Sequence, residues 1–160
     1  MESTNLKILL ADDDKDDCYY FREALAELPV AADLTTFYDG EKLMQMLYKD
    51  PESLPDVLFL DLNMPGKSGF ECLEELKRNE RFKHLPVIIF STSYEPTIAD
   101  KLYKNGARYY ISKPSNFTQL INVIHIAIRL VMQDSDSLPD KEVFFLNDLE
   151  KKLLINSSIK

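Results

Sequence analysis

The sequence lacks the residues that mark several common protein classes. Its 160 residues include only two cysteines, Cys18 and Cys72, and they do not have CxxC spacing. No disulfide framework or paired-cysteine metal site is therefore indicated, and we expect both cysteines to be reduced core residues. The two histidines, His84 and His125, are not paired by any pattern in the sequence. Disulfide scaffolds and cysteine-rich metal proteins are disfavoured as classes.

Long hydrophobic runs and basic runs are also missing. The longest apolar stretch, residues 123–132, is interrupted by His125 and Arg129 and is too short to span a bilayer. The N-terminal apolar run is too short for a secretory signal. With 19 basic and 27 acidic residues the net charge is −8, which repels phosphate backbones. We expect a cytoplasmic chain that binds neither nucleic acid nor membranes.

The chain does contain a regular alternation of strand and helix patterns. A hydrophobic fraction of 45% is enough to build a core. Short apolar runs predict strands over 6–11, 34–38, 57–61, 87–91 and 107–112, and helical spacing predicts helices over 18–28, 41–49, 70–78, 97–106 and 117–132. Alternation with short loops implies parallel strands and right-handed crossovers. The predicted fold is α/β, a flavodoxin-like three-layer sandwich with a five-stranded parallel sheet and helices on both faces.

Polar residues stand at the carboxyl ends of the predicted strands, where ligand sites form in parallel sheets. Asp12 and Asp13 follow the first strand, and Asp61 ends the third. Ser91 ends the fourth strand and Lys113 follows the fifth. Carboxylates, a hydroxyl and an ammonium group are therefore predicted to meet at one edge of the sheet.

These groups predict phosphoryl chemistry with a metal ion. Asp12, Asp13 and Asp61 cannot all stay ionised cheaply without a cation, and an all-oxygen set suits Mg²⁺. No histidine or cysteine joins them, which disfavours zinc and copper. Lys113 and Ser91 supply the positive charge and the donor that phosphoryl transfer needs. Asp61 is central and is followed at once by a turn, so it is the best candidate for a nucleophile that forms an aspartyl phosphate.

Four motifs carry a resemblance to a known family. They are "ADD" (11–13), "DLNMPGKSG" (61–69), "FSTS" (90–93) and "YYISKP" (109–114). Each is weak alone, but together they have the order and spacing found in that family. The chain resembles a receiver domain of two-component response regulators, of the stand-alone type, over residues 5–132.

The resemblance implies a role for each matched residue at the sheet edge. Asp61 would be the phosphoacceptor. Asp13 and Asp61 would bind Mg²⁺ directly, Asp12 would bind it through water, and Asn63 would offer its backbone carbonyl. Lys113 would pair with the phosphoryl group.

The resemblance also implies a switch. The Ser91 hydroxyl would turn toward the phosphoryl oxygen, and Tyr110 would swing inward to fill the space that Ser91 leaves. The Lys113–Pro114 bond is expected to be cis, which would aim Lys113 into the site. The phosphoryl donor would be a sensor histidine kinase or a histidine phosphotransfer protein, and the output would be contact with a downstream protein target. Such a chain is not an enzyme for other substrates and catalyses only its own phosphoryl transfer and autodephosphorylation.

Three further aspartates, Asp14, Asp16 and Asp17, follow the metal-binding pair. We interpret them as acids of a first helical turn that cap free N–H groups and complement the helix dipole.

Other function classes fit less well. For an aspartate-nucleophile phosphatase of the haloacid dehalogenase type, we would expect the nucleophile in a DxD motif near the first strand. Here the candidate nucleophile stands on the third strand, where residues 61–63 read Asp-Leu-Asn, and no substrate cap is visible. A flavin-binding domain would need a phosphate-binding loop where this chain has aspartates. The alternative that stays open is a receiver-like adaptor that is not phosphorylated.

About 28 residues follow Met132, too few for an output domain. We assign residues 133–160 to a C-terminal extension, with a polar linker over 133–140 and an apolar element over 142–155. Helical spacing favours a short amphipathic helix, although "VFFL" alone also fits a strand. The helix at 117–132 is apolar on more than one face. We expect tail residues 143–154, from the same chain or from a homodimer partner, to cover part of it.

Overall fold

The computed structural model describes residues 5–133 and 139–159. The strands are β1 (Leu6–Ala11), β2 (Ala32–Phe37), β3 (Val57–Leu60), β4 (Val87–Ser91) and β5 (Tyr109–Ser112). The helices are α1 (Lys15–Ala26), α2 (Gly40–Lys49), α3 (Gly69–Arg78), α4 (Pro96–Lys104), α5 (Phe117–Gln133) and α6 (Leu146–Ile159), and a 3₁₀ turn, η1 (Lys141–Val143), precedes α6.

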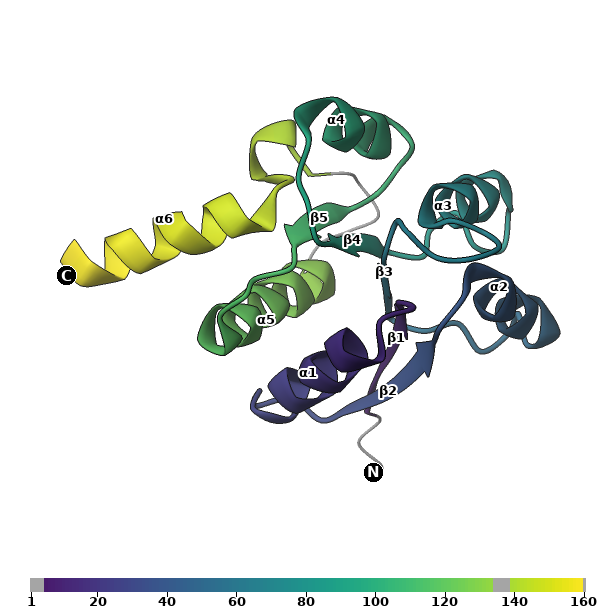
Figure 1. The fold of residues 1–160 in the computed structure, drawn as a ribbon, viewed down its shortest axis with the longest axis horizontal. Helices are drawn as coiled ribbons and strands as arrows, with labels where there is room; N and C mark the ends of the chain where they lie inside the picture. Colours follow the sequence, from purple (N-terminus) through teal and green to yellow (C-terminus); the bar gives the residue numbers. More distant parts are fainter. Residues whose placement is uncertain (1–4, 134–138, 160) are drawn as a thin grey trace.

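The strands form one parallel sheet in the order β2-β1-β3-β4-β5. Helices α1 and α5 cover one face, and α2, α3 and α4 cover the other (Figure 1). The predicted three-layer sandwich is therefore confirmed. The order reverses between β1 and β3, so the carboxyl ends of these two strands lie side by side. No helix in the described part of the chain is both long enough and apolar enough to cross a membrane.

Strands β2, β3 and β5 have limits that differ from the sequence prediction, and β3 ends at Leu60 rather than 61. Strand β2 begins at Ala32 rather than 34, because the parallel ladder with β1 starts at the pair Leu6 and Ala32. Strand β5 begins at Tyr109 rather than 107, although the Arg108 N–H already donates to the Val87 carbonyl at 2.8 Å. The start of β2 is therefore set by backbone pairing rather than by the hydrophobic pattern.

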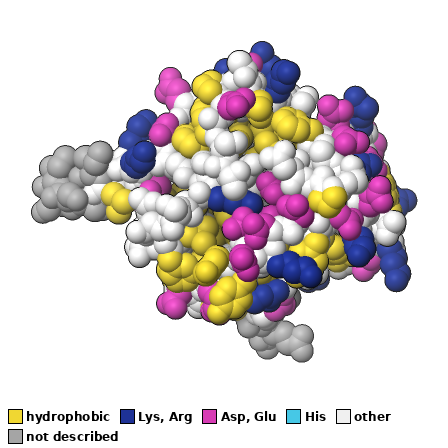
Figure 2. Space-filling view, in the orientation of Figure 1, with side chains coloured by type: hydrophobic (Ala, Val, Ile, Leu, Met, Phe, Trp, Pro, Cys, Tyr) yellow, Lys and Arg dark blue, Asp and Glu magenta, His cyan; other side chains and the backbone are white. Residues whose placement is uncertain are grey.

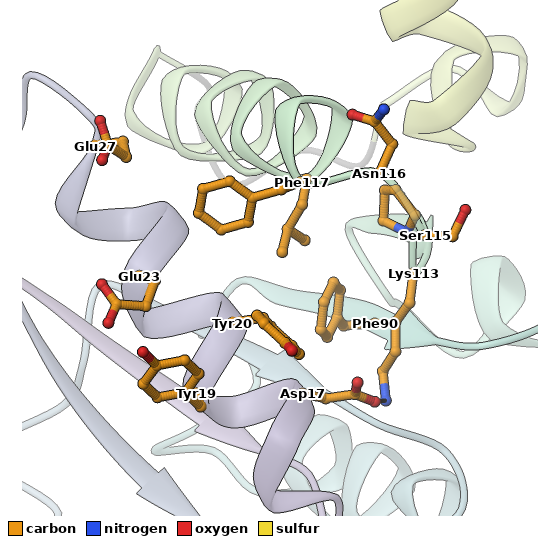
Figure 3. A pocket seen from close by; sticks show the side chains of 12 residues that line it. Asp17, Tyr19, Tyr20, Glu23, Glu27, Phe90, Lys113, Ser115, Asn116 and Phe117 are labelled. Carbon is orange, nitrogen blue, oxygen red and sulfur yellow. Dashed lines mark hydrogen bonds and ion pairs between the residues drawn. The ribbon is translucent and has the colours of Figure 1, made fainter.

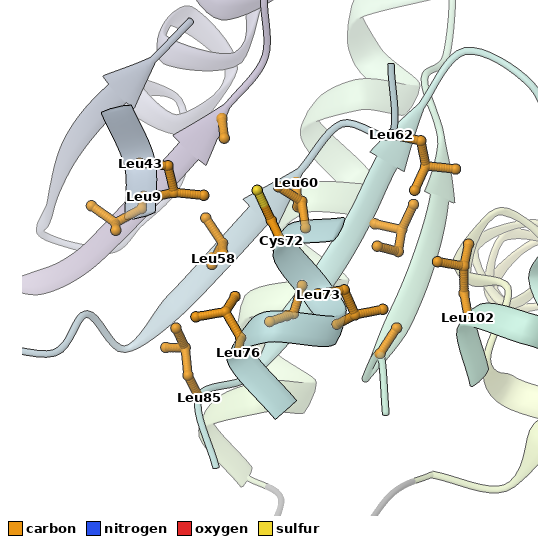
Figure 4. Packing of buried hydrophobic residues seen from close by; sticks show 14 of the residues in the cluster. Leu9, Leu43, Leu58, Leu60, Leu62, Cys72, Leu73, Leu76, Leu85 and Leu102 are labelled. Atoms are coloured by element: carbon orange, nitrogen blue, oxygen red, sulfur yellow. The ribbon is translucent and has the colours of Figure 1, made fainter. Parts of the chain in front are cut away.

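The core has two halves because successive strand residues point to opposite faces of the sheet. In β1, Ile8 and Leu10 pack with α1 and α5, whereas Leu9 and Ala11 pack with α2 and α3. Figure 4 shows the second half, in which leucines of the sheet meet Cys72 and its helical neighbours. Both cysteines are free and buried, as predicted.

The C-terminal extension runs along the outer edge of β5. The Tyr110 N–H donates to the Phe144 carbonyl at 2.9 Å, and Phe145 forms an isolated parallel bridge with Tyr110. The Asn147 side chain accepts from the Ser112 N–H and donates to the Ser112 carbonyl, both at 2.8 Å. The backbone of β5 is thus paired on its outer side at Tyr110 and Ser112.

Helix α6 then leaves the edge and packs on α5, extending outward from the body of the molecule (Figure 1). It begins at Leu146, later than the predicted element at 142. Leu146 is fully buried in the half of the core that includes β5 and α5, and Leu149 packs against the same cluster. The predicted cover of α5 is therefore present within one chain. Most of the predicted linker, residues 134–138, lies outside the described residues.

The contact between the extension and α5 predicts unequal effects of two leucine truncations in α6. Leu146→Ala removes a fully buried side chain and should lower the free energy of unfolding by about 2–4 kcal/mol. Leu153→Ala makes the same chemical change at a side chain that is 45% exposed and should cost less than about 0.5 kcal/mol. Urea unfolding of both variants measures the difference. Equal effects would contradict docking of the extension.

Candidate functional site

The acidic site forms where β1 and β3 end beside each other. The Asp61 N–H donates to the Ala11 carbonyl at 2.9 Å, so the residues after the two strands are held in register. Asp12 is fully buried, and Asp61 is 5% exposed. One carboxylate oxygen from each of Asp12, Asp13 and Asp61 lies within 4.8 Å of the others. The three predicted metal ligands are therefore together.

The turn after Asp61 brings the next helix close to it. Gly66 has a φ of 70°, a conformation that favours glycine. Ser68 and Glu71 form a capping box that starts α3. A Cβ on Gly69 would lie 2.2 Å from the Asp61 carbonyl oxygen, so only glycine allows α3 to begin this close to the sheet.

Lys113 supplies the positive charge at the site. Its Nζ lies 2.7 Å from Asp12 Oδ2, 2.8 Å from Asp17 Oδ2 and 3.7 Å from Asp61 Oδ2. The expected cis bond at Lys113–Pro114 is wrong, because no peptide bond among the described residues is cis. The trans form is the intrinsically preferred one, and with it the long lysine side chain still reaches the carboxylates.

Burial controls the protonation of these groups. It raises the pKa of Asp12 from 3.8 to about 7, despite the contact with Lys113, and it also raises the pKa of Asp61. Burial alone would lower the pKa of Lys113, but hydrogen bonds to Asp12 and Asp17 outweigh it and raise that pKa. The site therefore has more carboxylate groups than positively charged groups. Oxygen donors in this state fit a hard divalent cation, which would offset their charge.

Two predicted switch residues lie on neighbouring strands. Ser91 is buried at the end of β4, and its carbonyl accepts from the Lys113 N–H at 2.7 Å. Tyr110 is buried with its ring against Tyr94 and Phe145, and its hydroxyl donates to the Ser93 carbonyl. Tyr110 therefore points inward, while the predicted swing stays a prediction.

The three additional aspartates have different roles. Asp14 caps α1, as predicted, by accepting from the N–H groups of Asp16 and Asp17. Asp17, however, also binds Lys113, which the sequence interpretation missed. A signal was available, because Asp17 lies one helical turn after Asp13 and side chains in a helix tilt toward its N-terminus. An acid in the first turn can therefore reach back to the sheet edge.

The comparison with protein families agrees with this geometry. Residues 8–125 match the response regulator receiver domain. The chain belongs to this family. Within the receiver family it is 31% identical over 121 residues to the response regulator Rcp1 of Synechocystis sp., covering 73% of this chain and 82% of Rcp1.

Solved receiver structures share the fold. The phosphorylated cyanobacterial phytochrome response regulator RcpA is 32% identical to this chain, with a TM-score of 0.75. The alignment covers 86% of this chain and 100% of the RcpA chain. The Mn²⁺-bound form of Rcp1 is 28% identical to this chain, with a TM-score of 0.71. The alignment covers 84% of this chain and 99% of the Rcp1 chain. Receiver domains are signalling proteins and bind Mg²⁺ or Mn²⁺ at an acidic pocket.

The raised pKa of Asp12 predicts that the metal-free receiver loses stability as pH rises. The folded state holds a proton that the unfolded chain releases near its ordinary pKa of 3.8. The free energy of unfolding should therefore fall above about pH 4 and level off above about pH 7, by at most roughly 4 kcal/mol from this group.

Urea unfolding at about pH 5 and about pH 8, without divalent ions, measures this change. In Asp12→Asn the difference between the two pH values should shrink by the contribution of Asp12. Identical pH dependence in the two proteins would contradict the assignment.

Proposed function

We propose that this receiver domain is a phosphoryl-accepting switch in which Asp61 is the nucleophile. The observation that carries the proposal is the cluster of Asp12, Asp13 and Asp61 with Lys113 3.7 Å from the Asp61 carboxylate. Asp61 belongs to this cluster, and only 5% of it is exposed. Its carboxylate is therefore shielded from most of the bulk water.

The acidic cluster is the proposed site for Mg²⁺. Asp13 and Asp61 would bind the ion directly, Asp12 through water and Asn63 through its backbone carbonyl. A bound divalent ion would supply positive charge to the phosphoryl oxygens. The Mn²⁺-bound form of the similar protein Rcp1 supports this assignment.

The proposed reaction is an in-line transfer to Asp61. A carboxylate oxygen of Asp61 attacks the phosphorus of a phosphorylated histidine on the donor, a new O–P bond forms, and the N–P bond breaks. The leaving imidazole nitrogen keeps the electron pair of that bond. The Lys113 ammonium balances negative charge on the phosphoryl oxygens. In autodephosphorylation a water oxygen attacks the phosphorus, the O–P bond to Asp61 breaks, and the proton of the water passes to solvent.

A pocket beside Lys113 is the proposed docking place for the donor. It lies between α1 and the start of α5 and has a volume of about 610 Å³ (Figure 3). Tyr19, Tyr20 and Phe117 are more than 40% exposed around it. Figure 2 shows that acidic side chains gather on the same side of the molecule, with exposed hydrophobic side chains nearby. A helix of a sensor histidine kinase or a histidine phosphotransfer protein would bury these aromatics and bring its phosphohistidine to Asp61.

The proposed output runs through β5. Ser91 would turn toward the phosphoryl group, and Tyr110 would respond within its aromatic surroundings. A changed face of α4, β5 and α5 would then meet a downstream protein target or a second copy of the chain. The alternative is an unphosphorylated adaptor. Such an adaptor would not require the cluster of buried carboxylates around Lys113.

Phosphorylation by a small donor tests the proposal. Incubation with Mg²⁺ and acetyl phosphate should give a labile adduct of one phosphoryl group by mass spectrometry, because the site itself catalyses the transfer. Asp61→Asn should abolish the adduct. Asp50→Asn, at an exposed aspartate at the end of α2, should leave it unchanged. An intact protein that never gains the adduct would favour the adaptor.

Metal binding can be measured separately. Mn²⁺ should bind the unphosphorylated receiver, as followed by electron paramagnetic resonance of the free ion. Asp13→Asn should weaken binding strongly because it removes a carboxylate ligand. Asp16→Asn makes the same charge change at an exposed residue of α1 and should have little effect. Equal weakening in both variants would mean that the ion responds only to net charge.

A further inference from the structure

Asp17 contributes a fourth carboxylate to the site, and it does so from a helix rather than from a strand end. Its Oδ2 accepts a hydrogen bond from Lys113 Nζ at 2.8 Å. Asp17 stands in the first turn of α1, and its own N–H donates to the Asp14 side chain at 3.1 Å. Figure 3 shows its carboxylate beside the Lys113 ammonium at one end of the pocket between α1 and α5. A capping role alone does not explain this contact.

Lys113 has three N–H donors. The 2.8 Å contact with Asp17 is a charge-assisted hydrogen bond, and the 2.7 Å contact with Asp12 is a close ion pair. The distance of 3.7 Å to Asp61 is too long for a hydrogen bond. The ammonium group is thus committed to two carboxylates and only approaches the third.

We propose that Asp17 is a positioning residue that competes with the Asp61 phosphoryl group for Lys113 and so limits the lifetime of the phosphorylated state. The inference rests on the proposed function. A phosphoryl group on Asp61 adds negative charge near Lys113 and draws the ammonium toward it. Asp17 opposes this movement through its hydrogen bond. The Asp17 and Asp61 carboxylates lie 2.8 Å and 3.7 Å from the same Lys113 Nζ, so the negative charge of Asp17 is also close to a phosphoryl group on Asp61.

The competition has a definite direction. With Asp17 neutral, Lys113 is freer to donate to the phosphoryl oxygens, and one repulsive charge is gone. The phosphorylated state should become more stable relative to the free carboxylate. Asp17 is 30% exposed, which screens the effect, so an about fivefold change is expected rather than a change of several orders of magnitude.

The experiment compares Asp17→Asn with the matched control Asp16→Asn. Both substitutions remove one negative charge from the first turn of α1, but among the described residues the ion-pair partners of Lys113 are Asp12, Asp17 and Asp61 and not Asp16. Beryllofluoride with Mg²⁺ serves as the phosphoryl analogue, and its apparent Kd is read by NMR titration. The half-life of the adduct formed with acetyl phosphate is read by mass spectrometry.

Asp17→Asn should bind beryllofluoride about fivefold more tightly than Asp16→Asn and should keep the phosphoryl group correspondingly longer. Asp17→Glu, which retains the charge, should behave like the unsubstituted chain. Equal or weaker binding in Asp17→Asn would overturn the competition and leave Asp17 as a structural support for Lys113. If the unsubstituted chain itself takes neither beryllofluoride nor phosphate, the proposed function fails first.

Discussion

The structure depends on the burial of two carboxylates, Asp12 and Asp61, beside a single ammonium group. Desolvation of the two acids is only partly offset by Lys113, which is why their pKa values stay raised. The unfavourable desolvation of the two acids is offset by the packing of an otherwise apolar sheet, in which β3 is buried on both faces. A site of this kind favours the binding of a cation and of a ligand that can pair with Lys113. Buried acids with raised pKa values are typical of functional rather than structural sites.

Much of this arrangement was predictable from the sequence because it follows from topology. Apolar runs placed the strands, alternation made them parallel, and parallel strands brought Asp12, Asp61 and Lys113 to one edge. The start of β2 was not predictable, since backbone pairing extends the strand without a hydrophobic signal. The contact of Asp17 with Lys113 was missed for a similar reason. It depends on where α1 begins and how its first side chains tilt, which composition does not reveal.

The C-terminal extension shows another limit of pattern reading. Helical spacing over 142–155 predicted a helix, and the alternative of a strand was left open. The chain uses both possibilities in turn, with Phe145 bridging to Tyr110 and a helix starting at Leu146. Tyr110 therefore joins two parts of the molecule, because its strand leads toward the acidic site and its ring touches the extension. Any displacement of the Tyr110 ring would change its contacts with the rings of Phe144 and Phe145.

The pairing of Asn147 with Ser112 has a consequence for how the molecule behaves at high concentration. Edge strands of a sheet expose unpaired N–H and C=O groups that can recruit a strand from another chain. Here a side-chain amide imitates the backbone of a neighbouring strand and saturates Ser112 in both directions. In the described part of the chain, β2 is left as the outer strand at the opposite end of the sheet. The extension thus leaves fewer unpaired backbone groups on β5 to which a strand of another chain could bind.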